Sequence, residues 1–304
     1  MREIIEKARD YASGWLGQGN AATFIPELTK QDPNLLGVSV TTCDGETCSI
    51  GDCHAKFTIQ SISKLVLLAV ALEDRGFDYV FSRVGMEPSG DRFNSIYRLE
   101  LSDKKPANPM INAGAISVSG CIAGGSAEER AQKVLRLAAK CMGVETVERD
   151  AQVFRCEVET GHRNRALTYM MQDNGVLDGD VNSHLELYYH ACSMLVDCEM
   201  LGHFGAVLAN GGKVPATGEQ LFDGETARLL RVFMASCGLY NRAGEFAWRV
   251  GVPAKSGSAG GIMAAVPGRL GIGTFSPLLD GTGNSVCGMK ALEYLSRELG
   301  LSVY

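Results

Sequence analysis

The chain has 304 residues, of which 45% are hydrophobic, and its formal net charge at pH 7 is −6. This composition provides enough apolar material for one large domain or two closely packed ones. An acidic balance without runs of Lys or Arg argues against a nucleic-acid-binding surface. The densest apolar run, residues 65–72, is too short to cross a bilayer. We therefore expect neither nucleic acid nor a membrane as a partner.

Cysteine and histidine usage indicates a reducing compartment and no metal centre. The charged N-terminus has no apolar core of the signal-peptide type, so we expect a cytoplasmic protein whose ten cysteines are reduced. Cys43, Cys48 and Cys53 follow one another at five-residue spacing, which fits no common zinc pattern, and the chain contains no H-E-x-x-H. The sequence therefore predicts no metal site.

Hydrophobic periodicity predicts the order of the secondary-structure elements. Helices are predicted over residues 2–17, from Ser61 to Leu72, after Pro109, after the N-cap Ser126, and over residues 162–175, 181–197, 199–210, 224–236 and 286–299. Strands are predicted over residues 36–42, 47–51, 56–59, 244–250, 262–266 and 270–275, and residues 74–107 are predicted to be mostly loop.

Consecutive strands joined by short turns favour an antiparallel sheet over a doubly wound one. We predict an α+β fold in which the sheet is flanked by helices. Residues 1–304 would form a single unit, with an α/β part over roughly residues 1–75 and 240–304 and a large helical insert over residues 76–239.

Ser61 and Lys64 are three residues apart, where a β-like run gives way to an apolar helix. At this spacing they share one helix face, and Ser61 lies at the positive end of the helix dipole. A buried lysine there should have a lowered pKa. A neutral amine beside a hydroxyl is a nucleophile–base pair. On its own, however, S-x-x-K is more often an N-cap followed by a solvated lysine.

A second polar set, Lys255-Ser256-Gly257, precedes a β-like run near the C-terminus. On an edge strand it would form one wall of a cleft, where the cation provides a field and the glycine permits close approach of a substrate. In isolation it is an ordinary turn. Together, S-x-x-K and a later K-S-G resemble the serine β-lactamase and penicillin-binding superfamily. The chain has no S-D-N and no export signal, which argues against a β-lactamase itself.

Further motifs narrow the resemblance to the glutaminases of the bacterial and mitochondrial type. They begin at Phe24 (Phe-Ile-Pro-Glu-Leu), Gln60 (Gln-Ser-Ile-Ser-Lys), Phe93 (Phe-Asn-Ser), Asn108 (Asn-Pro-Met-Ile-Asn-Ala-Gly-Ala-Ile), Glu157 (Glu-x-x-x-Gly-x-Arg-Asn), Ser236 (Ser-Cys-Gly-Leu-Tyr) and Pro253 (Pro-Ala-Lys-Ser-Gly). The resemblance covers nearly the whole chain. It implies a serine β-lactamase-like fold, hydrolysis of L-glutamine to L-glutamate and ammonia without a cofactor, and a homodimer or homotetramer.

The resemblance also implies a role for individual residues. Ser61 would be the nucleophile, Lys64 would take its proton, and Tyr240 would assist proton transfer. The backbone N–H groups of Ser61 and Ser258 would form an oxyanion hole. The substrate would be bound by Gln60, Asn112, Glu157, Asn164, Tyr188, Tyr240 and Ser258, with Glu157 opposite the ammonium group. Taken singly, most of these residues fit ordinary roles, such as helix caps for Asn and core positions for Tyr.

Two positions depart from the family pattern. Phe24 stands where relatives usually carry a tyrosine that contacts the substrate, and Ser258 stands where valine is usual. A missing hydrogen bond to a charged group costs about 1–3 kcal/mol, so we expect weaker glutamine binding or an altered substrate. The alternatives are a related serine amidohydrolase with a shifted substrate, a β-lactam included, and a glutamine-binding protein with little turnover.

Overall fold

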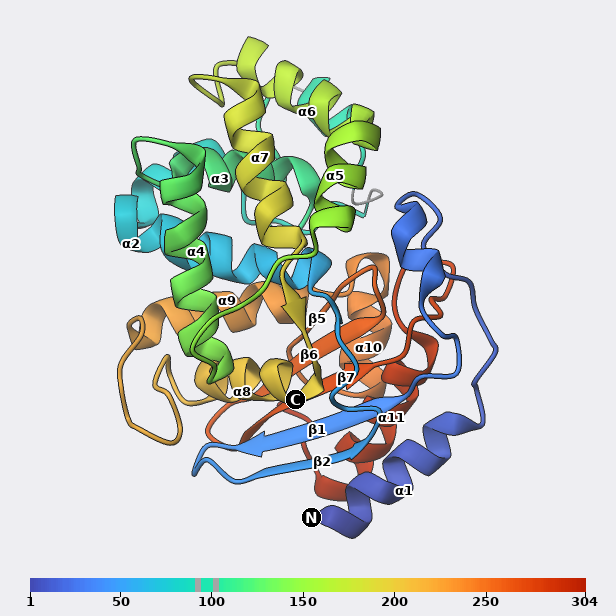
Figure 1. Ribbon diagram of the computed structural model, residues 1–304. Coiled ribbons are helices and arrows are strands. Elements are labelled where there is room, and N and C mark those ends of the chain that lie inside the picture. The colour runs from blue at the N-terminus through green and yellow to red at the C-terminus, as the bar shows by residue number, and fades with distance from the viewer. Residues whose placement is uncertain (91–93, 101–103) are drawn as a thin grey trace.

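The computed structural model describes residues 1–90, 94–100 and 104–304, so Phe93 of the Phe-Asn-Ser motif lies outside it (Figure 1). The helices are α1 (Arg2–Ser13), α2 (Lys64–Arg83), α3 (Asn112–Cys121), α4 (Ala127–Met142), α5 (Ala151–Thr160), α6 (His162–Asp173), α7 (Val181–Cys192), α8 (Cys198–Ala209), α9 (Gly224–Cys237), α10 (Ala243–Arg249) and α11 (Val286–Leu299). The strands are β1 (Gly37–Thr42), β2 (Thr47–Gly51), β3 (Phe57–Thr58), β4 (Leu195–Val196), β5 (Ala254–Ser256), β6 (Gly261–Val266) and β7 (Leu270–Phe275).

The main sheet has five antiparallel strands in the order β2-β1-β7-β6-β5. The N-terminal hairpin β1–β2 meets the C-terminal hairpin β6–β7 through the pairing of β1 with β7, in which Gly37 is opposite Phe275. The two ends of the chain therefore build one sheet, and the residues between them form the helical part. This arrangement confirms the predicted α+β fold with an antiparallel sheet.

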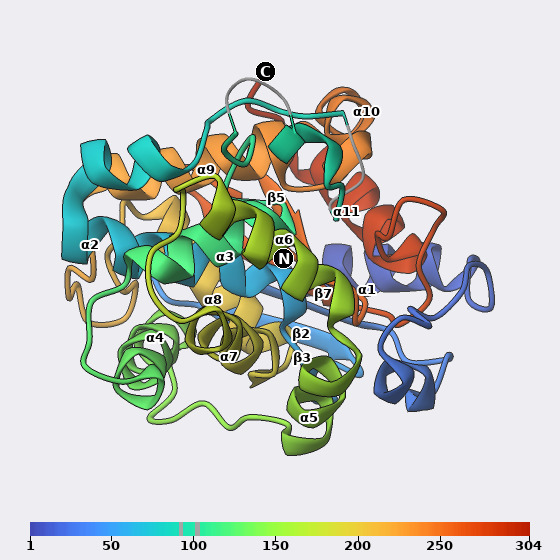
Figure 2. The same ribbon diagram turned by 90° about the horizontal axis from the view of Figure 1, so that it is seen from above.

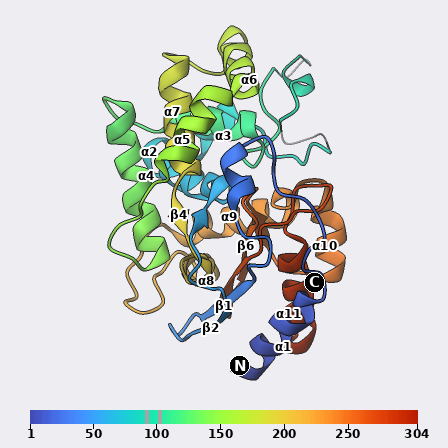
Figure 3. The same ribbon diagram turned by 45° about the vertical axis from the view of Figure 1, so that its right-hand side comes forward.

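Helices cover both faces of the sheet. Helices α1 and α11 pack side by side on one face (Figure 3), against the apolar positions of the strands such as Val38, Val40 and Ile272. Helix α8 covers the other face at very close range. A Cβ added at Gly271 would lie 2.0 Å from the backbone nitrogen of Ala206, so only glycine permits this contact. The close packing fixes α8 rigidly against β7.

The helical part surrounds the start of α2. Residues 65–71 of α2 are all buried, and α2 packs against α3, α4 and α9. Seen from above, α3 and α6 lie over the region where α2 begins (Figure 2). The predicted strand over residues 56–59 is present as β3, but it pairs with β4 rather than with the main sheet. This small sheet holds the chain just ahead of Ser61.

The prediction of a strand over residues 244–250 is wrong, because this segment is helix α10. Strand geometry would place Phe246 and Trp248 on one face, whereas Phe246 is buried and Trp248 is 81% exposed. Glu245 forms ion pairs with Arg242 at 2.7 Å and Arg249 at 2.8 Å. Pairs at this helical spacing contribute roughly 0.2–0.5 kcal/mol each. Charge spacing was therefore the better signal here than the alternation of aromatic residues.

Other boundaries differ from the predicted ones. The expected loop over residues 74–107 begins too early, because α2 continues to Arg83 after an interruption at Gly76, where φ is 75°. Helix α5 was not predicted, although Asp150 caps it by accepting hydrogen bonds from the backbone N–H groups of Gln152 and Val153. The helix predicted over residues 181–197 ends at Cys192 and is followed by β4.

Two further observations bear on the expected organisation. Helix α8 belongs to the predicted insert, residues 76–239, yet packs on the main sheet. None of the helices within the described residues is long and apolar enough to cross a membrane.

Candidate active site

A pocket of about 170 Å³ lies where the helical part meets the sheet side of the molecule. Lys64 and the Lys255-Ser256-Gly257 segment that was predicted to form a wall of the cleft do not line this pocket. Eight other predicted site residues do: Gln60, Ser61, Asn112, Glu157, Asn164, Tyr188, Tyr240 and Ser258. These residues come from the segment before α2, from helices α3, α5, α6 and α7, and from the loops before α10 and after β5. Residues almost 200 positions apart in the sequence are thus brought around one small cavity.

Ser61 lies in the 3₁₀ helix Gln60–Ser63, which runs directly into α2. Its side chain lines the pocket, and the residue is 9% exposed. The first N–H groups of a helix have no partner within it, so the backbone N–H of Ser61 is available to a ligand. The end of β5 approaches this segment closely, since a Cβ at Gly257 would lie 2.5 Å from the Ile59 carbonyl oxygen. Gly257 therefore permits backbone packing beside the nucleophile candidate.

Lys64 is fully buried behind the pocket wall. Its Nζ donates hydrogen bonds to the backbone carbonyl of Met110 at 3.1 Å and to Oδ1 of Asn112 at 2.8 Å. Burial lowers the pKa of Lys64 to about 8, and the nearby Glu157 opposes that shift. The lowered pKa predicted from the sequence is confirmed in direction. A neutral amine at this position is therefore accessible near physiological pH.

Gln60 and Glu157 form a second buried polar pair in the pocket. Glu157 is 6% exposed, and burial raises its pKa to about 8. A hydrogen bond from Gln60 and the charge of Lys64 lower the pKa and so oppose this shift. The Gln60 side chain donates to Oγ1 of Thr58 at 3.1 Å and accepts a hydrogen bond from Oγ of Ser258 at 3.2 Å. The Ser258 hydroxyl therefore fixes the amide orientation of Gln60.

A chain of hydrogen bonds connects Lys64 to the far wall of the pocket. Oδ1 of Asn112 accepts from Lys64 and also from the Tyr188 hydroxyl at 3.2 Å. Its Nδ2 donates to Oδ1 of Asn164 at 3.1 Å. Burial raises the pKa of Tyr188 well above its ordinary value, so the phenol stays a neutral donor. The caps expected as alternatives for Asn112 and Asn164 are not the role of these side chains, which bond to each other.

Tyr240 links Ser61 to the second lysine motif. Its hydroxyl forms a side-chain hydrogen bond with Ser61 and accepts one from Nζ of Lys255 at 3.2 Å. Burial raises the pKa of Tyr240 to about 12 and lowers the pKa of Lys255 well below its ordinary value, helped by the charge of Lys64. Lys255 therefore does not form a wall of the cleft, as the sequence predicted, but contacts the site through Tyr240. Tyr240 and Gln60 both have positive φ, 54° and 51°, a strained conformation that clusters at functional sites.

Several lining residues were given no role by the sequence analysis. They are Phe24, whose departure from the pattern was noted, and Ile25, Asn94, Thr160, Gly161, Arg163, Tyr189, Cys192, Leu279 and Gly283. Asn94 and Arg163 belong to the quoted motifs, and they are joined by a hydrogen bond from Nε of Arg163 to the carbonyl of Asn94 at 2.7 Å. Their positions in these motifs were therefore the sequence signal from which a place in the pocket could have been predicted. Within the described residues, the one group of three potential metal ligands lies outside this pocket.

Comparisons with known proteins agree over the whole chain. A sequence model of the family described as Glutaminase matches residues 19–304. A glutaminase of Clostridium botulinum (strain Kyoto / Type A2) is 46% identical over 305 residues, covering 100% of this chain and 99% of that protein. A solved structure described as the probable glutaminase ybaS has a TM-score of 0.95 at 37% identity, covering 100% of this chain and 97% of that chain. The crystal structure of Mglu in its glutamate form has a TM-score of 0.91 at 36% identity, covering 99% of this chain and 68% of that chain.

The sheet, its flanking helices and the likeness to these structures define a serine β-lactamase-like enzyme that acts as an amidohydrolase. More narrowly, the chain belongs to the glutaminase family. The resemblance predicted from the ordered motifs is thereby confirmed, and so are the fold class and the enzymatic function that it implied.

Proposed function

We propose that this enzyme hydrolyses L-glutamine to L-glutamate and ammonia through an acyl-enzyme formed on Ser61. The observation that carries the proposal is that Ser61, Tyr240 and Glu157 line one small pocket, with Lys64 bonded directly to its wall. A nucleophile, a proton acceptor and a carboxylate suited to an ammonium group are the parts that amide hydrolysis of a free amino acid requires.

In the acylation step, Oγ of Ser61 attacks the side-chain amide carbon and its proton passes to the neutral amine of Lys64. The lowered pKa of Lys64, about 8, makes that neutral form available. The developing oxyanion is stabilised by the backbone N–H groups of Ser61 and Ser258. Support for this pairing comes from Gly257, which allows the chain next to Ser258 to approach the segment next to Ser61.

Ammonia leaves with a proton supplied through Tyr240. The phenol is protonated at neutral pH because its pKa is raised to about 12. Lys255 donates a hydrogen bond to the Tyr240 oxygen, and the Tyr240 hydroxyl is also hydrogen-bonded to Ser61, so the phenol lies beside the nucleophile. As ammonia leaves, the proton that Lys64 took from Ser61 passes to Tyr240, so that the amine and the phenol return to their starting forms. Water then attacks the γ-glutamyl ester and Lys64 accepts its proton. Lys64 returns that proton to Oγ of Ser61 as glutamate is released. Every proton taken from Ser61 or water is returned to ammonia or to the serine.

The amino-acid head group is held by Gln60, Asn112, Glu157, Asn164, Tyr188, Tyr240 and Ser258. Burial raises the pKa of Glu157 to about 8, which favours the protonated carboxyl. A substrate ammonium lowers that pKa and forms an ion pair shielded from water. The side chains of Tyr188 and Asn164 are uncharged, so they do not repel the carboxylate of the substrate. The structure of Mglu in its glutamate form supports glutamate as the product of this reaction.

The test is ammonia release from L-glutamine by the purified enzyme, with L-asparagine and D-glutamine as paired substrates. We expect turnover of L-glutamine to exceed that of both controls by more than tenfold. Turnover of L-asparagine equal to that of L-glutamine would contradict the assigned substrate. Acylation by a fluorescent penicillin, with no ammonia release from glutamine, would instead support the related serine hydrolase.

We also propose that residues 1–304 act as one catalytic unit, as a homodimer or homotetramer in the cytoplasm. The pocket supports the single unit because Glu157 and Tyr188 line it from the helical part, and Ser258 and Leu279 from the sheet side. The oligomer and the compartment rest on the resemblance to the family. Light scattering of the purified chain tests the oligomer, and a monomer at micromolar concentration would contradict it.

A further inference from the structure

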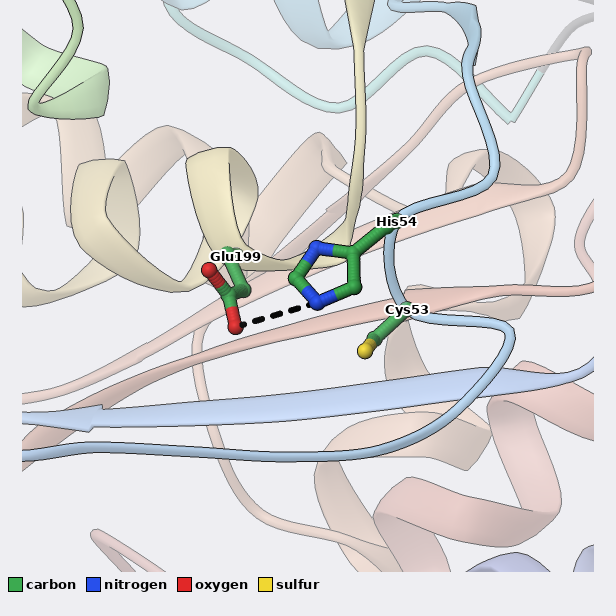
Figure 4. Close-up of side chains that lie close together, drawn as sticks. All are labelled: Cys53, His54 and Glu199. Carbon is green, nitrogen blue, oxygen red and sulfur yellow. Dashed lines mark ion pairs between the residues drawn. The ribbon is translucent and has the colours of Figure 1, made fainter.

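Three potential metal ligands from distant parts of the sequence meet beside α8, outside the pocket. The ligand atoms of Cys53, His54 and Glu199 all lie within 4.8 Å of one another, and Nε2 of His54 is 3.8 Å from Oε1 of Glu199. Figure 4 shows the imidazole between the thiol and the carboxylate, with all three groups facing a common space. Cys53 and His54 come from the loop after β2, and Glu199 from the first turn of α8.

We propose that Cys53, His54 and Glu199 form a binding site for one Zn²⁺ ion, with water as the fourth ligand. Zinc takes sulfur, nitrogen and carboxylate ligands in tetrahedral geometry, whereas magnesium and calcium prefer oxygen donors alone. Bonds of about 2.0–2.3 Å place neighbouring ligand atoms roughly 3.5 Å apart in a tetrahedron. The observed separations therefore require only small side-chain rotations.

Surrounding hydrogen bonds hold two of the three ligands in place. Oγ of Ser49 donates to Oε1 of Glu199 at 2.7 Å, which orients the carboxylate. The backbone N–H of Cys198 donates to the carbonyl of Cys53 at 3.0 Å, which fixes the loop to the start of α8. Such supporting bonds orient metal ligands and commonly change affinity when removed. His54 is the exposed member, since its side chain is 72% exposed.

The local charge favours a cation. Asp52 and Asp197 flank the cluster along the chain, and both carboxylates lie near the Cys198 thiol. Lys56 is the nearest cation along the chain, and its ion pair with Asp197 at 2.7 Å offsets that carboxylate. Asp52 and Glu199 are then the acidic groups near the Cys198 thiol that favour a cation. Exposure of His54 gives an incoming ion access, and the buried Cys53 supplies the soft ligand on the inner side.

A zinc ion here would join the loop before β3 to α8. That loop leads to Phe57, whose strand precedes Ser61, but none of the three ligands lines the pocket. The site is therefore expected to stabilise the fold without taking part in hydrolysis. Spacing rules missed it because Glu199 is distant in sequence from the Cys-His pair, and the sequence-based expectation of no metal site is revised by this proposal.

The test titrates the purified full-length enzyme with Co²⁺, whose thiolate complexes absorb in the near ultraviolet, and then displaces it with Zn²⁺. We expect one equivalent of Co²⁺ to give a sulfur-to-cobalt band that one equivalent of Zn²⁺ removes. The band should be absent in Cys53→Ser. It should be present in the control variant Cys48→Ser, because Cys48 is a half-buried cysteine outside the cluster. Glu199→Gln and His54→Ala should each weaken binding by more than tenfold, and Ser49→Ala by roughly tenfold.

Zinc should also raise the Tm of the wild-type enzyme, and this rise should be lost in His54→Ala, an exposed position where misfolding is not expected. The kcat for glutamine should be unchanged at one equivalent of Zn²⁺. An undiminished cobalt band in Cys53→Ser, equal zinc affinity in His54→Ala and wild type, or no Co²⁺ binding at all would overturn the site. Because metal absorption is independent of turnover, this result is separate from the test of glutamine hydrolysis.

Discussion

The floor and the rim of the pocket differ in burial and in origin. We define the floor as Gln60, Ser61, Glu157 and Tyr188, with Lys64 behind it, all 9% exposed or less. We define the rim as Phe24, Asn94, Thr160, Arg163 and Gly283. The floor is polar, hydrogen-bonded and held by the starts and faces of helices, whereas the rim is contributed largely by loops and helix ends, and Phe24 is 54% exposed.

This difference separates chemistry from substrate selection. Buried floor groups have strongly shifted pKa values because the surrounding protein excludes water, as for Lys64 and Glu157. Rim groups are solvated, so each contributes less to binding and can change without disturbing the reaction. We therefore expect floor substitutions to affect kcat or binding by orders of magnitude, and rim substitutions to change KM by roughly tenfold or less.

Apart from loss of the nucleophile itself, the largest effect is expected for Lys64→Met, which keeps the volume of the side chain and removes the proton acceptor. Loss of a general base costs roughly 10²–10⁴-fold, so kcat should fall in that range. In the wild type, kcat should rise with pH through about 8, because the buried amine must lose its proton to act. The variant should lack this rise. A variant with normal kcat and the same pH profile would show that Lys64 is not the base.

Glu157→Gln should mainly affect binding. The variant keeps the shape but loses the negative charge opposite the substrate ammonium, and hydrogen bonds to charged groups contribute about 1.5–3 kcal/mol. KM for L-glutamine should therefore rise roughly ten- to a hundredfold, with a smaller change in kcat. Steady-state kinetics and calorimetric glutamate binding provide the measurement. An unchanged KM would remove Glu157 from the proposed head-group site.

The floor residues were named in advance through the family resemblance, and Gln60, Ser61, Lys64 and Glu157 lie in motifs quoted for it. Ser61 and Lys64 are fixed by one helix start, and the amphipathic pattern that buries α2 is visible directly. Hydrophobic periodicity gave wrong element boundaries or types where tertiary packing overrides the local sequence preference. Residues 74–107 were predicted to be mostly loop, although α2 resumes after Gly76 and continues to Arg83. Helix α10 was mistaken for a strand because its aromatic residues alternate.

The rim was not predictable in the same way. Asn94 and Arg163 lie 69 positions apart, and only the folded loops bring them into hydrogen-bonding contact. Outside the rim, the hydrogen bond between Ser258 and Gln60 of the floor spans 198 positions in the same way. No local periodicity encodes such contacts, because they depend on how the helical part closes over the sheet. The Cys53 cluster is a third case, since its third ligand lies on α8.

On the rim, Phe24→Tyr should lower the KM for L-glutamine by roughly tenfold. A phenolic hydroxyl restores a hydrogen bond to the charged head group, worth about 1–1.5 kcal/mol at a partly exposed position. The matched control is Phe77→Tyr, an exposed phenylalanine on α2 that does not line the pocket. The control should leave KM unchanged. Equal KM values in wild type and Phe24→Tyr would show that the missing hydroxyl at Phe24 does not weaken glutamine binding.

The smallest effect is expected for Ser258→Val. It removes one neutral hydrogen bond, the one to Oε1 of Gln60 at 3.2 Å, while the backbone N–H remains. Such a bond contributes about 1 kcal/mol, so KM should rise by about fivefold or less and kcat should be nearly unchanged. Ser258→Ala separates the hydroxyl from side-chain size and should match the valine variant. A large fall in kcat in both would mean that the hydroxyl itself takes part in the reaction.

The central claim is that Ser61 is the nucleophile, and the most direct measurement compares ammonia release from L-glutamine by Ser61→Ala and Ser63→Ala. Ser63 is a fully buried serine in the same 3₁₀ helix that donates to the Gln60 carbonyl at 2.7 Å and does not line the pocket. The account predicts that Ser61→Ala loses activity to background while still binding glutamate, and that Ser63→Ala retains turnover. Near wild-type ammonia release by folded Ser61→Ala would contradict it.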